Sequence, residues 1–235
     1  MLKKEIVKQM CVEHSWDFAL FEKYADLIEE KNKVMNLTGF SGERLWEEGI
    51  LESLLFMLEI TKDYSNSEGF SILDIGAGAG FPSIPFALTK PNVKFTIYEP
   101  IQKRVNFLNE TVEKLGLQNQ VKVFAKRVEE EKEKNLFDIV TARAVSDIRS
   151  LLMAGFHTVK LNGKMSLLKS INYQNELKEA QDILDKLKTK IEIMPFDHDF
   201  FERHNVIVEI QKLRSTPKEF PYLWKDIKKK TQKGK

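Results

Sequence analysis

The stretch Ile72-Leu73-Asp74-Ile75-Gly76-Ala77-Gly78-Ala79-Gly80-Phe81-Pro82 decides the fold: an apolar run ends in three alternating glycines and a proline. A short apolar run bounded by glycines is typical of a buried strand, and a proline after the turn suits the first turn of a helix. Glycines let a ligand approach the backbone, and a helix N-terminus offers unpaired N–H groups. The stretch therefore predicts a strand, a ligand-binding turn and a helix in succession.

The spacing of the glycines distinguishes two kinds of nucleoside cofactor. The dinucleotide fingerprint is G-x-G-x-x-G, whose third glycine lets the helix pack over a pyrophosphate. Here the order is G-x-G-x-G, and Phe81 stands in the place of that third glycine. The spacing favours a ligand without a pyrophosphate, and S-adenosylmethionine is the leading candidate over NAD. A tight turn that binds nothing is the alternative.

Two acidic residues flank this turn in the sequence. Glu99 follows Gly76 by 23 residues, at the end of the next apolar run. A carboxylate at that position can accept hydrogen bonds from both ribose hydroxyls of a nucleoside. Asp74, two residues before the glycines, can orient the turn or meet the ammonium group of a methionine moiety. Both residues support the interpretation of a cofactor site.

From Phe70 onward, apolar runs alternate with amphipathic stretches, which is the pattern of a parallel α/β sheet. The expected strands cover residues 70–76, 93–99, 121–125, 137–143, 163–169, 191–196 and 205–213. The expected helices between them cover residues 82–89, 101–116, 147–160 and 173–189. The last two strands are joined too closely for a parallel crossover. We therefore predict an α/β fold with a mostly parallel seven-stranded sheet that ends in an antiparallel hairpin.

The segment before this sheet has apolar residues at helical spacing, and Ser15 is the expected N-cap of one of its helices. We predict three parts: a helical extension over residues 1–62, the α/β domain over 63–214, and a basic tail over 215–235. The whole chain carries a net charge of only +2. From Lys212 to the end, however, the chain has nine Lys or Arg and only two acidic residues, Glu219 and Asp226. This end would suit a polyanion such as RNA, and a merely solubilising end is the alternative.

Other features exclude several classes of protein. The single cysteine, Cys11, cannot form an internal disulfide, and no Cys/His cluster has structural-zinc spacing. Asp197, His198 and Asp199 are expected to form a solvated turn and not a metal site. No signal-peptide core or membrane span is present. We expect a cytoplasmic protein that is monomeric and binds neither a membrane nor a metal.

The motifs together resemble those of the bacterial 16S rRNA guanine-N7 methyltransferase family, known as RsmG or GidB. They cover roughly residues 30–220 and combine into a pattern more specific than any single motif. The matching residues are Asn36-Leu37-Thr38, the glycine stretch, Glu99, Lys103-Arg104, Phe107-Leu108, Arg127-Val128-Glu129-Glu130, Thr141-Ala142-Arg143-Ala144 and Arg203-His204. Departures from the family pattern occur at Glu48 to Ser53, Ser83, Ser170 and Pro221-Tyr222.

The resemblance implies a class I S-adenosylmethionine-dependent methyltransferase fold and a substrate of 16S rRNA or the small ribosomal subunit. It also implies roles for cofactor-binding residues. Gly76, Gly78 and Phe81 would line the methionine and ribose side. Glu99 would bind the ribose, and Val128 and Glu129 would flank the adenine. Asp74 and Arg143 complete the expected cofactor set.

Methylation of guanine N7 needs no general base, because N7 carries no proton and attacks the methyl group with its own lone pair. Arg143, at the end of the fourth strand, could hold a phosphate or guanine O6. The alternative is an ion pair with Glu129 or Asp147. Lys169, at the end of the fifth strand, is the second catalytic candidate, and a solvated lysine is its alternative. Phe200 and Phe201 could stack a base or simply pack the hairpin.

Three functions therefore remain open at this point. The first is an enzyme that methylates guanine N7 in 16S rRNA. The second is an enzyme of the same fold that acts on another RNA position or on a protein. The third is a non-catalytic module that binds RNA or the cofactor.

Overall fold

The structure is a computed structural model that describes residues 2–64, 69–198 and 201–232. The chain divides into two compact units, one of residues 1–70 and 76–125, the other of residues 71–75 and 126–235. The chain enters the second unit at Ser71, returns to the first unit at Gly76, and enters the second unit again at Lys126. The division by sequence into an extension, an α/β domain and a tail stays a prediction.

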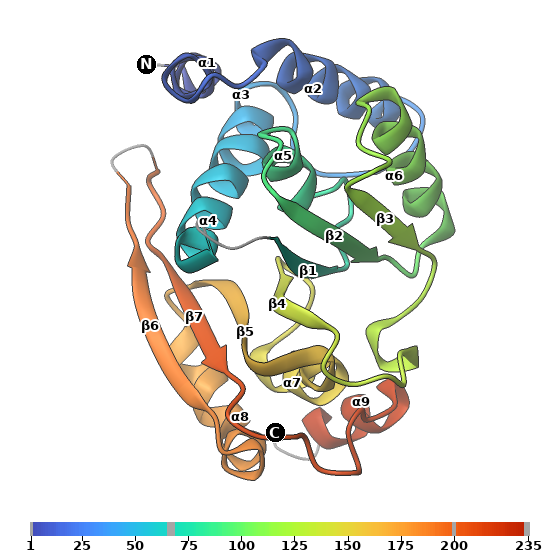
Figure 1. The fold of residues 1–235 in the computed structure, drawn as a ribbon, viewed down its shortest axis with the longest axis vertical. Coiled ribbons are helices and arrows are strands. Elements are labelled where there is room, and N and C mark those ends of the chain that lie inside the picture. The colour runs from blue at the N-terminus through green and yellow to red at the C-terminus, as the bar shows by residue number, and fades with distance from the viewer. Residues whose placement is uncertain (1, 65–68, 199–200, 233–235) are drawn as a thin grey trace. The chain divides into compact units, whose positions relative to one another are not determined.

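Within the described residues the strands form a seven-stranded sheet of order β3-β2-β1-β4-β5-β7-β6 (Figure 1). The pairs β2–β3, β1–β4 and β4–β5 are parallel, whereas β7 pairs antiparallel with both β5 and β6. The strands are β1 Phe70–Ile75, β2 Val93–Tyr98, β3 Val121–Phe124, β4 Phe137–Ala142, β5 Val159–Ser170, β6 Lys190–Phe196 and β7 Asn205–Gln211. The predicted sheet with its terminal antiparallel hairpin is confirmed.

The first unit carries β2, β3 and the helices α1 to α6. These helices are α1 Lys3–His14, α2 Phe18–Asn32, α3 Gly42–Arg44, α4 Glu52–Thr61, α5 Ser83–Ala87 and α6 Gln102–Lys114. A π-helical segment, Leu45–Leu51, joins α3 to α4. The prediction for Ser15 is wrong: it ends α1 in a left-handed conformation, and Asp17 caps α2 by accepting a hydrogen bond from Ala19 N. Aspartate caps at least as well as serine, so propensity alone could not choose between them.

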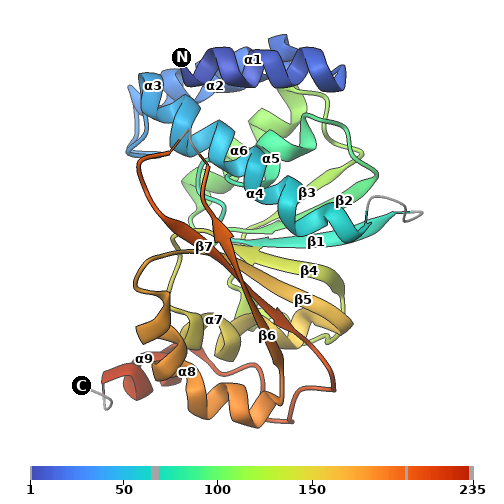
Figure 2. The same ribbon diagram turned by 90° about the vertical axis from the view of Figure 1, so that its left-hand side faces the viewer.

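The second unit carries β4 to β7 and the helices α7 Ile148–Gly155, α8 Tyr173–Leu187 and α9 Trp224–Gln232. Figure 2 shows these three helices on one side of its strands. The predicted helix over 147–160 is too long, since Phe156–Thr158 form a 3-10 turn and β5 already starts at Val159. The β-branched Val159 favours the extended backbone that begins there.

The basic end of the chain is partly folded onto the second unit. Lys212 is 1% exposed, and its ammonium group donates to Asn135 Oδ1, His157 O and Val159 O. Arg214 donates to the backbone carbonyls of Lys186 and Leu187. The buried Lys212 is therefore unavailable to a polyanion, whereas Arg214 is exposed.

The remainder of this end includes an ordered helix. Phe220 and Ile227 are buried, and Tyr222 N donates to Met153 O at 3.0 Å. Among the residues with described structure, no helix is both long and apolar enough to cross a bilayer.

Candidate cofactor-binding site

The glycine turn has the conformation that its sequence requires. Gly76, Gly78 and Gly80 have φ angles of 69°, 61° and 109°, the left-handed region that side chains rarely adopt. Four of the N–H groups expected to be unpaired in this turn already have acceptors within the protein. Gly76 N donates to Tyr98 O, Gly80 N and Phe81 N both donate to Ala77 O, and Gly78 N donates to Glu99. The following helix, α5, has only five residues. The turn therefore lets a ligand come close to the backbone, but it offers fewer free N–H donors than expected.

The space around the glycines differs from one to the next. A Cβ on Gly78 would meet no protein atom within 4 Å, so the surface above this residue is open. A Cβ on Gly80 would lie 2.5 Å from Ile84 Cγ1 and 3.0 Å from the Tyr24 hydroxyl. Gly80 is thus required by packing inside the first unit, whereas at Gly78 only the backbone conformation favours glycine. The open side of Gly78 leaves room for a ligand to approach the backbone.

Glu99 is bound to the glycine turn. Its Oε2 accepts from Gly78 N at 3.1 Å and its Oε1 accepts from Ile101 N at 3.0 Å. The side chain lies at the end of β2 and is 1% exposed. A carboxylate oxygen can accept more than one hydrogen bond, so these contacts leave acceptor capacity for ribose hydroxyls. The carboxylate also fixes the turn, a role that its spacing alone did not indicate.

Phe81 packs as a core residue of the first unit. Its ring meets Tyr24 edge-on and Phe40 at a tilt, each with centroids 6.0 Å apart. A Cβ on Gly49 would lie 2.8 Å from the Phe81 ring, so the π-helical segment needs a glycine there. The ring thus supports the turn from within the protein, and contact with the methionine side of a cofactor stays a prediction.

Two residues that support the glycine turn from the protein interior, Tyr24 and Gly49, were not predicted from the sequence. The Tyr24 hydroxyl donates to Ala79 O at 2.8 Å, and Tyr24 is fully buried. Gly49 makes room for Phe81, as described above. Gly49 lies in the stretch that departs from the family pattern, which was the available signal. The role of Tyr24 left no signal, because an aromatic residue at helical spacing looks like any core residue.

Three further predicted cofactor residues belong to the second unit. Asp74 is fully buried in β1 and pairs in register with Thr141 of β4. Val128 and Glu129 begin the short 3-10 turn Val128–Glu130 and are both buried. Burial raises the pKa of the Glu129 carboxyl above its usual value. Each of these residues is positioned by this unit's own backbone.

Arg143 directly follows β4 and is half-buried. Asp147, one of the two acids expected as an alternative ion-pair partner, caps α7: its Oδ1 accepts from Ser150 N and its Oδ2 from the Ser150 hydroxyl. The cap gives Asp147 a structural role at the start of α7. The substrate-binding or cofactor-binding role of Arg143 and its ion-pair alternative all stay predictions.

Lys169 lies near the end of β5, as predicted, but it is not the solvated lysine of the alternative interpretation. Its Nζ donates to Ser146 O at 2.8 Å and pairs with Glu176 Oε2 at 2.7 Å. The side chain is 11% exposed. A direct catalytic contact stays a prediction.

The hairpin between β6 and β7 has no arrangement typical of a metal centre among its described residues. Asp197 pairs with His204 at 3.1 Å on the surface, and His198 packs edge-on against Phe196. Phe201 stacks on Phe196, as core packing predicts. Asp199 and Phe200 lie outside the described residues. In the part of the chain that the structure covers, no group of three or more His, Cys, Asp or Glu side chains could hold a metal ion.

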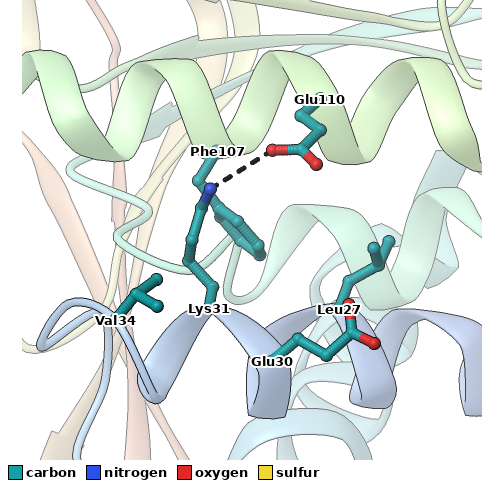
Figure 3. Close-up of a pocket in the computed structure, with 6 residues that line it drawn as sticks. All are labelled: Leu27, Glu30, Lys31, Val34, Phe107 and Glu110. Carbon is teal, nitrogen blue, oxygen red and sulfur yellow. Dashed lines mark hydrogen bonds and ion pairs between the residues drawn. The ribbon is translucent and has the colours of Figure 1, made fainter.

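A pocket of about 130 Å³ lies between α2 and α6 in the first unit (Figure 3). Lys31 Nζ and Glu110 Oε2 are 3.3 Å apart across it. Its lining residues are Leu27, Glu30, Lys31, Val34, Phe107 and Glu110. None of the predicted site residues lines it, so this pocket is separate from the glycine turn.

The strand order and the glycine turn after β1 define a class I methyltransferase fold. Two solved structures share it. The tRNA (m1A58) methyltransferase of Aquifex aeolicus aligns with a TM-score of 0.55 at 14% identity, over 68% of each chain. An S-adenosylmethionine-dependent methyltransferase of the same organism aligns with a TM-score of 0.52 at 18% identity, over 71% of this chain and 94% of that one. At these identities the likeness shows the fold alone.

Sequence relatives identify the family. Residues 17–206 match GidB, described as rRNA small subunit methyltransferase G, and the chain belongs to this family. The ribosomal RNA small subunit methyltransferase G of Mycoplasmopsis pulmonis is 39% identical over 212 residues, which cover 89% of this chain and 90% of that protein. Its namesake in Clostridium perfringens is 33% identical over 222 residues, covering 91% and 90%. The resemblance inferred from the motifs is confirmed.

Proposed function

We propose that this protein transfers the methyl group of S-adenosylmethionine to N7 of a guanine in 16S rRNA. The observation that carries the proposal is the open face of Gly78 beside the Glu99 carboxylate, in a member of this methyltransferase family. The Glu99 carboxylate bound to Gly78 N distinguishes this glycine from Gly116, whose surroundings are equally open. The protein would act in the cytoplasm as a monomer, on naked 16S rRNA or on the small subunit.

Different residues of the chain would bind different parts of the cofactor. The carboxylate of Glu99 would accept hydrogen bonds from the ribose hydroxyls, as its remaining acceptor capacity allows. Gly76 and Gly78 would lie against the methionine and ribose side, where a side chain would obstruct the ligand. Val128 and Glu129 would flank the adenine, and Asp74 would stabilise the turn or the methionine ammonium group.

The bound cofactor supplies an electrophilic methyl group on a sulfonium. Guanine N7 has a free lone pair and no proton, so the protein has no proton to remove. Catalysis must then come from holding the base in line with the methyl group and from excluding water. A guanidinium such as that of Arg143 could hold guanine O6 or a neighbouring phosphate in a fixed plane.

Mapping of N7-methylguanine in 16S rRNA tests the proposal. We expect cells that lack this protein to lose one such modification, and the purified protein with labelled S-adenosylmethionine to restore it on their small subunits or naked rRNA. Transfer of label to another RNA position or to a protein would move the activity to another substrate of the same fold. Cofactor binding without any transfer would support a binding module instead.

A further inference from the structure

The segment between β4 and α7, residues 143–147, is held by side chains from two other elements of the second unit. Lys169, from β5, donates to the carbonyl of Ser146 at 2.8 Å. Glu176, from α8, accepts through Oε2 from the amide of Ile148 at 2.9 Å. The two side chains therefore bind the backbone at nearby points, just after Arg143.

Lys169 and Glu176 also bind each other. Their Nζ and Oε2 atoms are 2.7 Å apart, and the side chains are 11% and 21% exposed. Charged groups this far from water are retained only with close partners, because dehydration is costly. The pair thus joins β5, α8 and the segment after β4 through one ammonium and one carboxylate. The ammonium group is committed to the protein and is poorly suited to serve as a substrate ligand.

Two residues of the segment contribute little to fixing its position. Ala144 has a φ angle of 54°, a left-handed conformation that costs energy in any residue with a Cβ. Val145 is exposed and so contributes little packing. Asp147 secures the end nearer α7 through its cap on Ser150. The Lys169–Glu176 pair adds the second point of attachment.

We propose that Lys169 and Glu176 are positioning residues: they hold residues 143–148 so that Arg143 can fix the RNA substrate for methyl transfer. This inference rests on the proposed function. Small displacements of a substrate-orienting group reduce the rate even when binding persists. Loss of the pair should therefore lower kcat much more than it lowers cofactor affinity.

The chain offers a matched control in the same strand. Lys164 of β5 pairs with Glu209 of β7 at 2.8 Å, and these side chains are 11% and 12% exposed. Lys164→Met and Lys169→Met remove equal charge from similar surroundings. A loss caused only by weaker folding would appear in both variants. A loss caused by the position of the segment would appear only in Lys169→Met.

The test measures kcat on small subunits, the Kd of S-adenosylmethionine, and amide hydrogen exchange. In Lys169→Met and Glu176→Gln we expect kcat to fall by about tenfold or more, with the Kd changed by less than about threefold. Amides of residues 144–148 should exchange faster in these variants and not in Lys164→Met. Lys169→Arg should recover part of kcat, because it restores a donor to Ser146 O.

The outcomes separate this inference from the function it rests on. Absence of methyl transfer by the unchanged protein defeats the proposed function. With an active unchanged protein, a wild-type kcat in Lys169→Met and Glu176→Gln overturns the positioning role alone. Equal losses in Lys164→Met and Lys169→Met overturn it as well. If Lys169→Met does not fold, Glu176→Gln and Lys169→Arg decide the question by the same measurements.

Discussion

Gly78 combines a left-handed backbone with open space, and the two properties predict different effects. In Gly78→Ala the strained backbone should cost about 1–2 kcal/mol of stability. The new methyl group would enter the space left for the cofactor, so affinity for S-adenosylmethionine should fall at least about tenfold. Calorimetric titration of the folded variant measures this loss.

Gly116 provides the control for this prediction, because it has a φ angle of 69° and equally open surroundings. It lies outside the glycine turn, between α6 and β3. Gly116→Ala should therefore lose similar stability and keep full cofactor affinity. Unchanged affinity in Gly78→Ala would remove the turn from the cofactor site.

Glu99 accepts two backbone hydrogen bonds, which makes its substitution by glutamine informative. A glutamine amide has one acceptor oxygen, so it cannot accept from both Gly78 N and Ile101 N in the same geometry. Glu99→Gln should weaken S-adenosylmethionine and S-adenosylhomocysteine alike, by about 1.5–3 kcal/mol. Titration with both ligands measures this, with the exposed Glu113→Gln as a control of equal charge. A loss confined to S-adenosylmethionine would place Glu99 near the sulfonium and not the ribose.

The buried His157 should make the free energy of unfolding depend on pH. The residue is fully buried, its Nε2 is 2.9 Å from Glu131 O, and burial lowers its pKa to about 4. A carbonyl can only accept, so the neutral ring donates through Nε2. Between pH 6.5 and 4 the unfolded chain binds a proton that the folded protein does not. The free energy of unfolding should therefore fall on acidification through this window, by up to about 3 kcal/mol from this residue.

Urea unfolding at several pH values between about 4 and 7 measures this dependence. His157→Gln has no titrating group here and can still donate to Glu131 O. Its stability should vary less with pH in that window, although it starts lower at neutral pH. Parallel curves for the two proteins would contradict the prediction.

At the scale of elements, the end of β4 carries Arg143, the proposed substrate-binding residue, and leads into the segment that is proposed to position it. Arg143→Lys keeps the charge but loses the planar group that fixes a base or phosphate. Turnover should therefore fall by about tenfold or more, and by more than cofactor affinity falls. Single-turnover methyl transfer and titration of S-adenosylmethionine measure the two effects separately. Equal losses would make Arg143 a cofactor ligand only.

Asp147 supplies the control at this exit. Asparagine caps a helix as well as aspartate, so Asp147→Asn should retain the cap on α7 while it removes the charge. We expect stability within about 0.5 kcal/mol of the unchanged protein, as for most mild substitutions. A kcat loss as large as that of Arg143→Lys would show that the charge of Asp147 assists Arg143.

At the scale of the whole molecule, the distribution of basic residues determines where a polyanion could bind. Lys212 is buried and bound to the protein, but Arg214 and, on α9, Lys225 and Lys228 are exposed. Lys228 and Arg127 both lie over the ring of Trp224, at 5.9 and 5.5 Å from its centroid. Cations beside an aromatic ring suit single-stranded RNA.

The double variant Lys225→Gln/Lys228→Gln should weaken RNA binding and leave cofactor binding unchanged. The slope of log K against log salt should become less steep by about 0.7–0.9 for each phosphate that the variant no longer neutralises. Substitution is preferable to truncation, because the buried Ile227 belongs to the same helix. Lys178→Gln/Lys186→Gln, on the exposed face of α8, is the control of equal charge. RNA affinity equal in the two double variants would assign α9 a solubilising role.

Much of the fold could be predicted because its signals are local. The alternation of apolar runs and amphipathic stretches indicated the sheet, and the short connection before β7 indicated the hairpin. Helix limits were predicted less well: α7 ends at Gly155, because apolar spacing alone does not distinguish the following 3-10 turn and the start of β5 from helix. The glycine spacing and Glu99 indicated the cofactor class, because the backbone conformation of a turn depends on its own residues.

The sequence by itself determined the glycine turn, the order of the elements and the family, since each depends on residue type and spacing along the chain. Only the tertiary structure decided how individual charged side chains are used. Lys212 looked like part of a basic tail, yet its three acceptors come from residues 53 to 77 positions earlier. Lys169 was predicted to be a catalytic residue or a solvated strand-end lysine, yet it binds Ser146 and Glu176. A long side chain takes whatever partner the fold brings within hydrogen-bond distance, and spacing along the chain does not encode that partner.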